Sequence, residues 1–205
     1  MIHGFNGYAL YADNNGTSSA QGFVITDSYF VKNHGGIYLR KSEFYKISNC
    51  DCTGNYIGIS LGGGNNTLAT CNISSNHYGI YMNNADGLSP NNTHGSVVGC
   101  IIQHSRICAV YINNMASGEI FSACNIDPNG TDGYAVQAVS AHRIIFIGCN
   151  FLDHSAISIT GGGLIMFNGC NFRDYTSSHY TSNSTKVRFV ACYNNSGDIV
   201  DPTQA

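Results

Sequence analysis

The sequence has little charge, little proline and no tryptophan. Asp, Glu, Lys and Arg make up 10% of the 205 residues, against about 25% in average globular proteins. The net charge of −3 and the pI of about 6.2 indicate no basic surface for nucleic acid or an anionic membrane. Three prolines are too few for a linker, and 43% hydrophobic residues, with 13 Tyr and 10 Phe, oppose disorder.

Long apolar runs and zinc-type spacings are also missing. No apolar run approaches the ~18 residues of a transmembrane helix, and the first ten residues, MIHGFNGYAL, lack the basic and apolar regions of a signal peptide. The nine cysteines include one close pair, Cys50 and Cys52, whose C-x-C spacing is not a zinc motif. We therefore expect no metal, no cofactor and no membrane insertion.

A repeat organises what is present. Seven cysteines recur at intervals of 21 to 29 residues, and Ser28 completes the series one interval earlier. Apolar residues occupy the positions three before and two after each of them, until Asn194 interrupts the second column at the last repeat. The repeated position is occupied by Ser28, Cys50, Cys71, Cys100, Cys124, Cys149, Cys170 and Cys192.

Each repeat reads as three short strands separated by Gly, Asn and Ser turns. A period of about 22 residues with equivalent residues at one step predicts a parallel β-solenoid of about eight coils. Coils would stack about 4.8 Å apart, placing like residues over like. We read the cysteines as free thiols inside the stack. Asn33, Asn55, Asn76 and Asn129 form a further column, which we expect to combine left-handed bends with stacked amides.

The repeat resembles a known family. The segments Phe146–Phe151 (FIGCNF) and Asn55–Ile59 (NYIGI) are similar to coils of the pectin-lyase-like superfamily. This resemblance implies an all-β fold, a right-handed, single-stranded parallel β-helix. The superfamily includes pectate lyases, polygalacturonases and bacteriophage tailspikes, so the resemblance is specific for fold and weak for function.

Catalytic motifs of the superfamily help to distinguish its possible functions. The N-T-D, D-D, G-H-G and R-I-K motifs expected of a polygalacturonase are missing, and no Asp cluster suggests the calcium site of a pectate lyase. Free cysteines and the lack of a signal peptide suit a tailspike or tail fibre assembled in the bacterial cytoplasm and carried on the virion. Its partner would be host surface polysaccharide. A secreted polysaccharide hydrolase or lyase, and a non-catalytic adhesin or scaffold, remain alternatives.

The repeat also sets the expected boundaries of a single domain. Regular coils run over 28–194, an incomplete first coil over 1–27, and a C-terminal end over 195–205. Because Met1 aligns with the repeated cysteine position, we expect either a fragment of a longer protein or a first coil completed by a partner. The outward residues Ile120, Ile145 and Met166 form an apolar stripe that predicts burial against another subunit or a long loop. In a protein that resembles a tailspike, this stripe implies a homotrimer.

Two groups of outward residues are candidates for function. Tyr11, Tyr38, Tyr81 and Tyr111 share one column, a platform for saccharide rings, for subunit contact, or only for one another. Asp153 and Asp174 share one bend position in adjacent coils, and Asp127 lies one position away in the preceding coil. Their separation would suit a retaining glycosidase pair, whereas solvated turn residues are the ordinary alternative. The long insertion at 83–94 is a candidate groove-lining loop.

Overall fold

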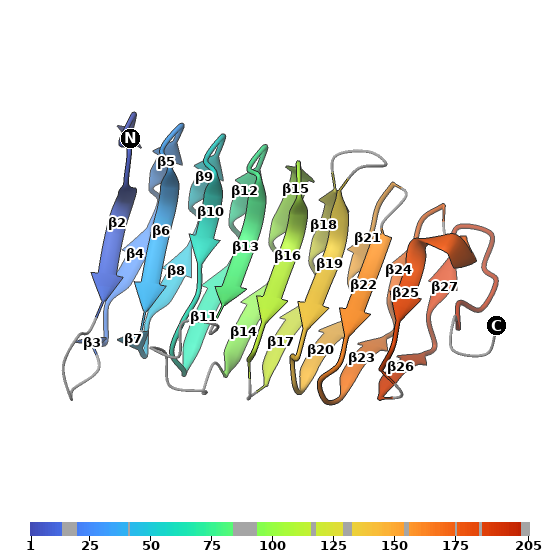
Figure 1. Cartoon of the computed structure of the whole chain (residues 1–205). Coiled ribbons are helices and arrows are strands. Elements are labelled where there is room, and N and C mark those ends of the chain that lie inside the picture. Colours follow the sequence, from blue (N-terminus) through green and yellow to red (C-terminus); the bar gives the residue numbers. More distant parts are fainter. Residues whose placement is uncertain are drawn as a thin grey trace.

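The chain is a stack of coils with three parallel sheets along its length. The computed structural model describes residues 1–13, 20–40, 42–83, 94–115, 118–128, 133–153, 156–174, 176–184 and 186–201. Successive strands of each sheet come from successive coils, and the two ends of the chain lie at opposite ends of the rod (Figure 1). The predicted parallel β-helix is therefore confirmed. The Asn129 position and most of the insertion at 83–94 lie outside the described residues.

Three long sheets form the sides of the rod. Sheet 1 contains β1 (Ile2–His3), β5 (Tyr29–Val31), β9 (Asp51–Thr53), β12 (Asn72–Ser74), β15 (Ile101–Ser105), β18 (Asn125–Pro128), β21 (Asn150–Phe151), β24 (Asn171–Phe172) and β27 (Tyr193–Asn194). Sheet 2 contains β2 (Tyr8–Asp13), β6 (Gly35–Arg40), β10 (Ile57–Ser60), β13 (Tyr78–Asn83), β16 (Cys108–Asn113), β19 (Tyr134–Val139), β22 (Ala156–Thr160) and β25 (Tyr180–Ser182). Sheet 3 contains β4 (Val24–Thr26), β8 (Lys46–Ser48), β11 (Asn66–Ala69), β14 (Gly95–Val98), β17 (Glu119–Ser122), β20 (Ile144–Ile147), β23 (Ile165–Asn168) and β26 (Val187–Val190).

Within the described ranges, two short strands and one turn accompany these sheets. β3 (Ala20–Gln21) pairs with β7 (Ser42–Glu43), and the 3₁₀ turn η2 (Ser177–His179) precedes β25. Among the described residues, no helix has the length and apolar character needed to cross a membrane.

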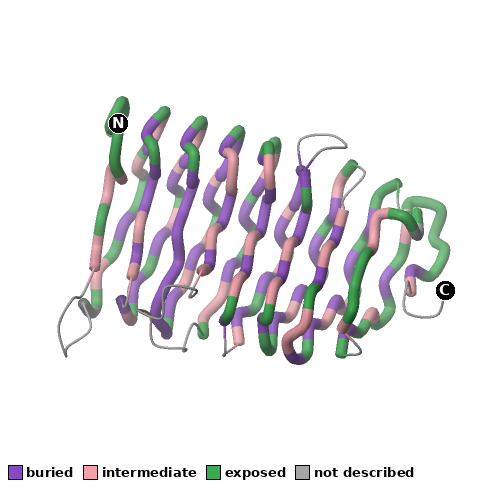
Figure 2. The backbone as a smooth tube through the Cα atoms, viewed as in Figure 1, coloured by how far each residue is buried: buried purple, intermediate pink, exposed green. Residues whose placement is uncertain are grey.

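Strand pairing places like residues over like, as the repeat predicts. Ile59 pairs with Ile37 on one side and Ile80 on the other, so three isoleucines stack in the interior. Phe146 stacks between Phe121 and Phe167, with ring centroids 4.9 Å apart on each side. Burial alternates along the strands (Figure 2) because successive side chains point to opposite faces.

The cysteines lie in the core. All nine are free and buried, which confirms the reading of the cysteine column as interior thiols. The thiols of the repeated position find backbone acceptors at the bend; the Cys124 Sγ lies 3.5 Å from the Val97 carbonyl and 3.4 Å from the Ser122 carbonyl. Cys108 in β16 is buried as well, and burial raises the pKa of its thiol to about 12, so this thiol stays protonated at neutral pH.

The asparagine column agrees with one of its two expected roles. Asn33, Asn55 and Asn76 are buried, and none of them has a positive φ, so the expectation of left-handed geometry at these residues is wrong. The expectation of stacked amides is correct. The Asn55 Oδ1 accepts the backbone N–H of Asn33 at 2.8 Å, and its Nδ2 donates to the Phe30 carbonyl at 2.9 Å.

The left-handed residue is the one before each asparagine. Lys32 and Ser75 have φ values of 54° and 55° there, and Gly54 has 71°. This turn brings the next side chain inward, and an amide satisfies the backbone groups that the bend removes from the sheets. Ser105 occupies the same inward position in the next coil and is fully buried.

Candidate functional site

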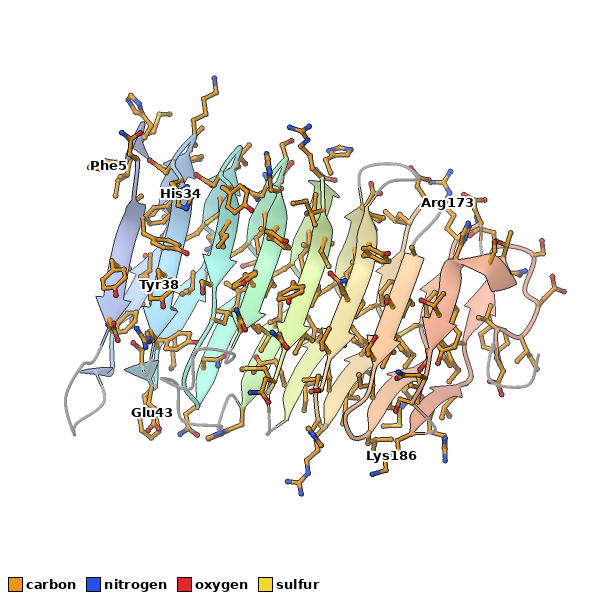
Figure 3. The ribbon with its side chains drawn as sticks, viewed as in Figure 1. Phe5, His34, Tyr38, Glu43, Arg173 and Lys186 are labelled. Carbon is orange, nitrogen blue, oxygen red and sulfur yellow. The ribbon has the colours of Figure 1, made fainter. Side chains whose placement is uncertain are left out.

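The most distinctive surface of the rod is a row of aromatic side chains on the outer face of sheet 2. Tyr11 pairs in register with Tyr38, and Tyr81 with Tyr111, in agreement with the predicted column. Ser60 separates the two pairs and is 6% exposed. Figure 3 shows Tyr38 on this face and His34 nearer the bend.

The tyrosines of each pair stack on one another. The centroids of Tyr11 and Tyr38 are 4.8 Å apart with an interplanar angle of 3°, and those of Tyr81 and Tyr111 are 5.0 Å apart with 14°. These separations are close to the expected spacing of coils, because the rings come from adjacent strands at the same register. Faces between paired rings are covered, so only the ends of the stacks and the ring edges remain for a ligand.

Polar side chains fix the phenol groups. The Tyr11 hydroxyl donates to Asp13 Oδ2 at 2.8 Å, and Arg40 Nη1 lies 3.4 Å from the same oxygen. In the second stack, Asn83 Nδ2 donates to the Tyr81 hydroxyl at 2.9 Å. Both contacts join a residue to the next outward residue of its own strand, two positions later. The hydrogen bond to Asp13 is the largest cause of the raised pKa of Tyr11.

A second aromatic row runs beside the first, at the bend before sheet 2. The Tyr56 ring stacks on His34 at 5.3 Å and contacts His77 at 4.9 Å. Tyr8 joins the two rows at the N-terminal end: its ring lies 4.6 Å from Tyr38 and over Gly35, where a Cβ atom would lie 2.0 Å from a ring carbon. Burial is the largest cause that raises the pKa of Tyr8 to about 12.

The three predicted catalytic acids lie together in the C-terminal half of the rod. Arg173 Nη1 is 3.9 Å from Asp153 Oδ1, and its Nε is 3.5 Å from Asp174 Oδ2. Asp127 is 9% exposed, with its Oδ2 at 4.0 Å from His104 Nε2. The pKa of Asp127 is raised by burial and by the charge of Asp153, whereas His104 and Arg173 lower it.

Backbone geometry by itself explains why aspartate occurs at two of these positions. Asp153 and Asp174 have φ values of 40° and 52°, and His104 has 53° at the same bend position. Asp is among the residues that tolerate a left-handed conformation. Arg173 contacts both carboxylates, as in a structural ion-pair network. The catalytic assignment of Asp127, Asp153 and Asp174 stays a prediction, and Figure 3 places Arg173 far along the rod from His34 and Tyr38.

Two features escaped the sequence reasoning. Glu119 is fully buried on the inner face of sheet 3. Its burial could have been predicted from the sequence, because Glu119 lies two residues before the inward Phe121 in the same strand.

A hollow of about 280 Å³ on sheet 1 is lined by Tyr29, Asn49, Cys50, Asp51, Thr70 and Asn72. Outward amides form a ladder farther along the same sheet, where Asn150 Nδ2 donates to Asn125 Oδ1 at 2.9 Å.

The comparison with protein-family models agrees with the fold. A family model described as a right-handed β-helix region matches residues 8–172. None of the curated proteins matches the sequence. Among solved structures, a chain from Parabacteroides merdae that is provisionally assigned as a glycosyl hydrolase shares 14% identity, over 88% of this chain and 85% of that one, with a TM-score of 0.30.

Proposed function

Since the chain belongs to the right-handed β-helix family, we propose that it binds polysaccharide through the tyrosine stacks of sheet 2. The observation that carries this proposal is the pair of ordered stacks, Tyr11 with Tyr38 and Tyr81 with Tyr111. Aromatic rings offer apolar faces to sugars, and fixed hydroxyl, amide and carboxylate groups offer hydrogen bonds.

The end of the second stack is the best place for a sugar ring. Tyr111 is covered by Tyr81 on one side, and the next residue of the column is Gln137. A pyranose ring that stacks on the outer face of Tyr111 would meet the Gln137 amide as a hydrogen-bond partner. The outer Tyr11 ring, which is 58% exposed, offers the equivalent face at the first stack.

The biological setting follows from the proposal. A rod that binds polysaccharide and has its cysteines reduced suits a segment of a phage tailspike or tail fibre, assembled in the bacterial cytoplasm and borne on the virion, with host surface polysaccharide as ligand. The apolar stripe supports a homotrimer: Ile120 is 39% exposed, Ile145 and Met166 are half-buried beside it in register, and the neighbouring Ile147 is 41% exposed. Light scattering of the purified chain tests this assembly, and a monomer at micromolar concentration would reject it.

Binding is tested with a panel of immobilised bacterial surface polysaccharides. We expect Tyr111→Ala to weaken binding by about fivefold or more, because an aromatic face contributes about 1 kcal/mol beyond its buried area. Tyr134→Ala is the matched control, since Tyr134 is a 36% exposed tyrosine of the same sheet outside both stacks. Equal binding by both variants would reject the tyrosine site.

The same panel separates binding from catalysis. Release of new reducing ends or of unsaturated products would favour a hydrolase or lyase, and the acids around Arg173 are the residues to replace in that case. Binding without product release favours the receptor-binding role. Neither binding nor cleavage across the panel would favour the scaffold alternative.

A further inference from the structure

The hollow on sheet 1 is a second candidate binding site, on a different side of the rod from the tyrosine stacks. Its lining comes from three coils: Tyr29 begins β5, Asp51 begins β9 and Asn72 begins β12. These three residues occupy one register column, and Asn49 and Thr70 lie at the bend just before it. Figure 1 shows the three strands side by side near one end of the rod.

The Tyr29 ring differs from the other outward tyrosines in the N-terminal half of the rod. It is 53% exposed, and within the described part of the chain no other aromatic ring stacks on it. Its register neighbour is Asp51, whose side chain is shorter than the ring, so the face toward the hollow is open. A free aromatic face beside hydrogen-bonding groups is the usual arrangement for holding a sugar ring.

The polar groups of the hollow are held in place by one another. Asn72 Nδ2 donates to Asp51 Oδ2 at 2.8 Å, and the Thr53 hydroxyl donates to Asp51 Oδ1. At the rim, the Thr70 hydroxyl donates to Asn49 Oδ1 at 2.6 Å. Each carboxylate oxygen of Asp51 can accept a further hydrogen bond, and the Asn72 carbonyl oxygen and Asn49 amide hydrogens add acceptors and donors. Groups ordered in advance bind a ligand with less loss of entropy.

The charge and size of the hollow restrict its ligand. Its lining contains one carboxylate and neither Lys nor Arg, so an anionic sugar would meet repulsion without a compensating cation. A volume of about 280 Å³ is near the lower end of small-molecule sites. We propose that this hollow binds one residue of a neutral saccharide, its ring stacked on Tyr29 and its hydroxyls bonded to Asp51 and Asn72. This inference rests on the proposed polysaccharide binding and adds a separate contact point with a stated ligand class.

The proposal is tested by ¹⁹F NMR of individual tyrosines in the intact chain during addition of oligosaccharides. The protein is labelled with 3-fluorotyrosine, and the ¹⁹F resonances of Tyr29 and Tyr111 are assigned through Tyr29→Phe and Tyr111→Phe. The probes are maltotetraose, cellotetraose and mannotetraose as neutral oligosaccharides, and tetragalacturonate as the anionic one. We expect a neutral probe to shift the Tyr29 resonance and tetragalacturonate to leave it in place.

Variants locate the contact. Asp51→Asn removes the charged acceptor and is expected to weaken the probe that shifts Tyr29 by about tenfold, and Tyr29→Ala is expected to weaken it by about the same factor. Tyr193→Ala is the matched control, because Tyr193 occupies the same column at the far end of the sheet and is 44% exposed. Circular dichroism checks that each variant keeps the β-sheet spectrum.

The outcomes distinguish this site from the proposed function. A shift at Tyr111 without one at Tyr29 overturns the hollow and leaves the tyrosine stacks supported. A shift at Tyr29 without one at Tyr111 supports the hollow and rejects the stacks. No shift at either tyrosine with any probe overturns both, and preferential binding of tetragalacturonate at Tyr29 overturns the neutral ligand class.

Discussion

Glu119→Gln is expected to stabilise the rod at neutral and alkaline pH. Glu119 is fully buried, and no hydrogen-bond partner within the described residues satisfies either carboxylate oxygen. The buried Tyr45 hydroxyl and Asn66 amide, from neighbouring positions of the same interior column, also lack partners. Gly95 leaves room between Asn66 and Glu119, since a Cβ there would lie 2.3 Å from the Asn66 Oδ1.

The magnitude follows from the pKa of the carboxyl. Burial raises the pKa of Glu119 from 4.5 to about 8. The folded protein therefore holds this proton more tightly than the unfolded chain does. The difference of about 3.5 pKa units corresponds to about 5 kcal/mol.

The sign determines the pH range of the effect. Below pH 4.5 the carboxyl is protonated in both states, and its full contribution to stability is present. As pH rises from 4.5 to 8, the unfolded chain ionises first, and the free energy of unfolding falls by about 1.4 kcal/mol per pH unit from this group. Above about pH 8 both states are ionised, and the loss is complete. Glutamine has nearly the same shape and never ionises, so it removes this dependence.

The assay is urea unfolding followed by circular dichroism, for the wild type and the variant at several pH values from 5 to 9. We expect the stability difference between Glu119→Gln and wild type to be small at pH 5 and to grow by several kcal/mol by pH 8. Glu43→Gln is the control, because Glu43 is only partly buried in β7 and points outward at the edge of the rod (Figure 3). A pH-independent difference, or a variant less stable at pH 8, would refute the reasoning.

Three further predictions concern the ladders and bends. Asn55→Ala should lower the free energy of unfolding by about 3 kcal/mol in urea titrations, because it leaves two buried backbone groups unpaired; Asn150→Ala, in the exposed amide ladder, should change it by less than about 1 kcal/mol. Gly95→Ala should reduce the melting temperature, with an overpacking cost of about 1–3 kcal/mol. If Asp153 and Asp174 are catalytic, Asn at both positions abolishes any polysaccharide cleavage detected as new reducing ends; undiminished cleavage would exclude them.

The sequence alone predicted the coils because the repeated side chains are apolar and can be buried only in the interior of the stack. The Cys124 column and the isoleucines around Ile59 must be inside, since strand alternation and stacking leave one face for apolar residues. The tyrosine column followed from the same alternation. The error at Asn33 arose because adjacent residues at a bend, one left-handed and one inward, cannot be told apart by spacing alone.

Tertiary structure decided what these columns present to solvent. The spacing of the repeat predicted that Tyr11 lies beside Tyr38. Only the orientation of the ring planes shows that the two rings cover each other's facing sides. The hollow beside Tyr29 depends on side chains from three coils, and a neighbour's size determines whether a ring face is open. Periodicity in this chain therefore specifies the stack and the direction of each side chain, because both depend on the backbone repeat. The sites depend on side-chain packing between coils, which the repeat does not encode.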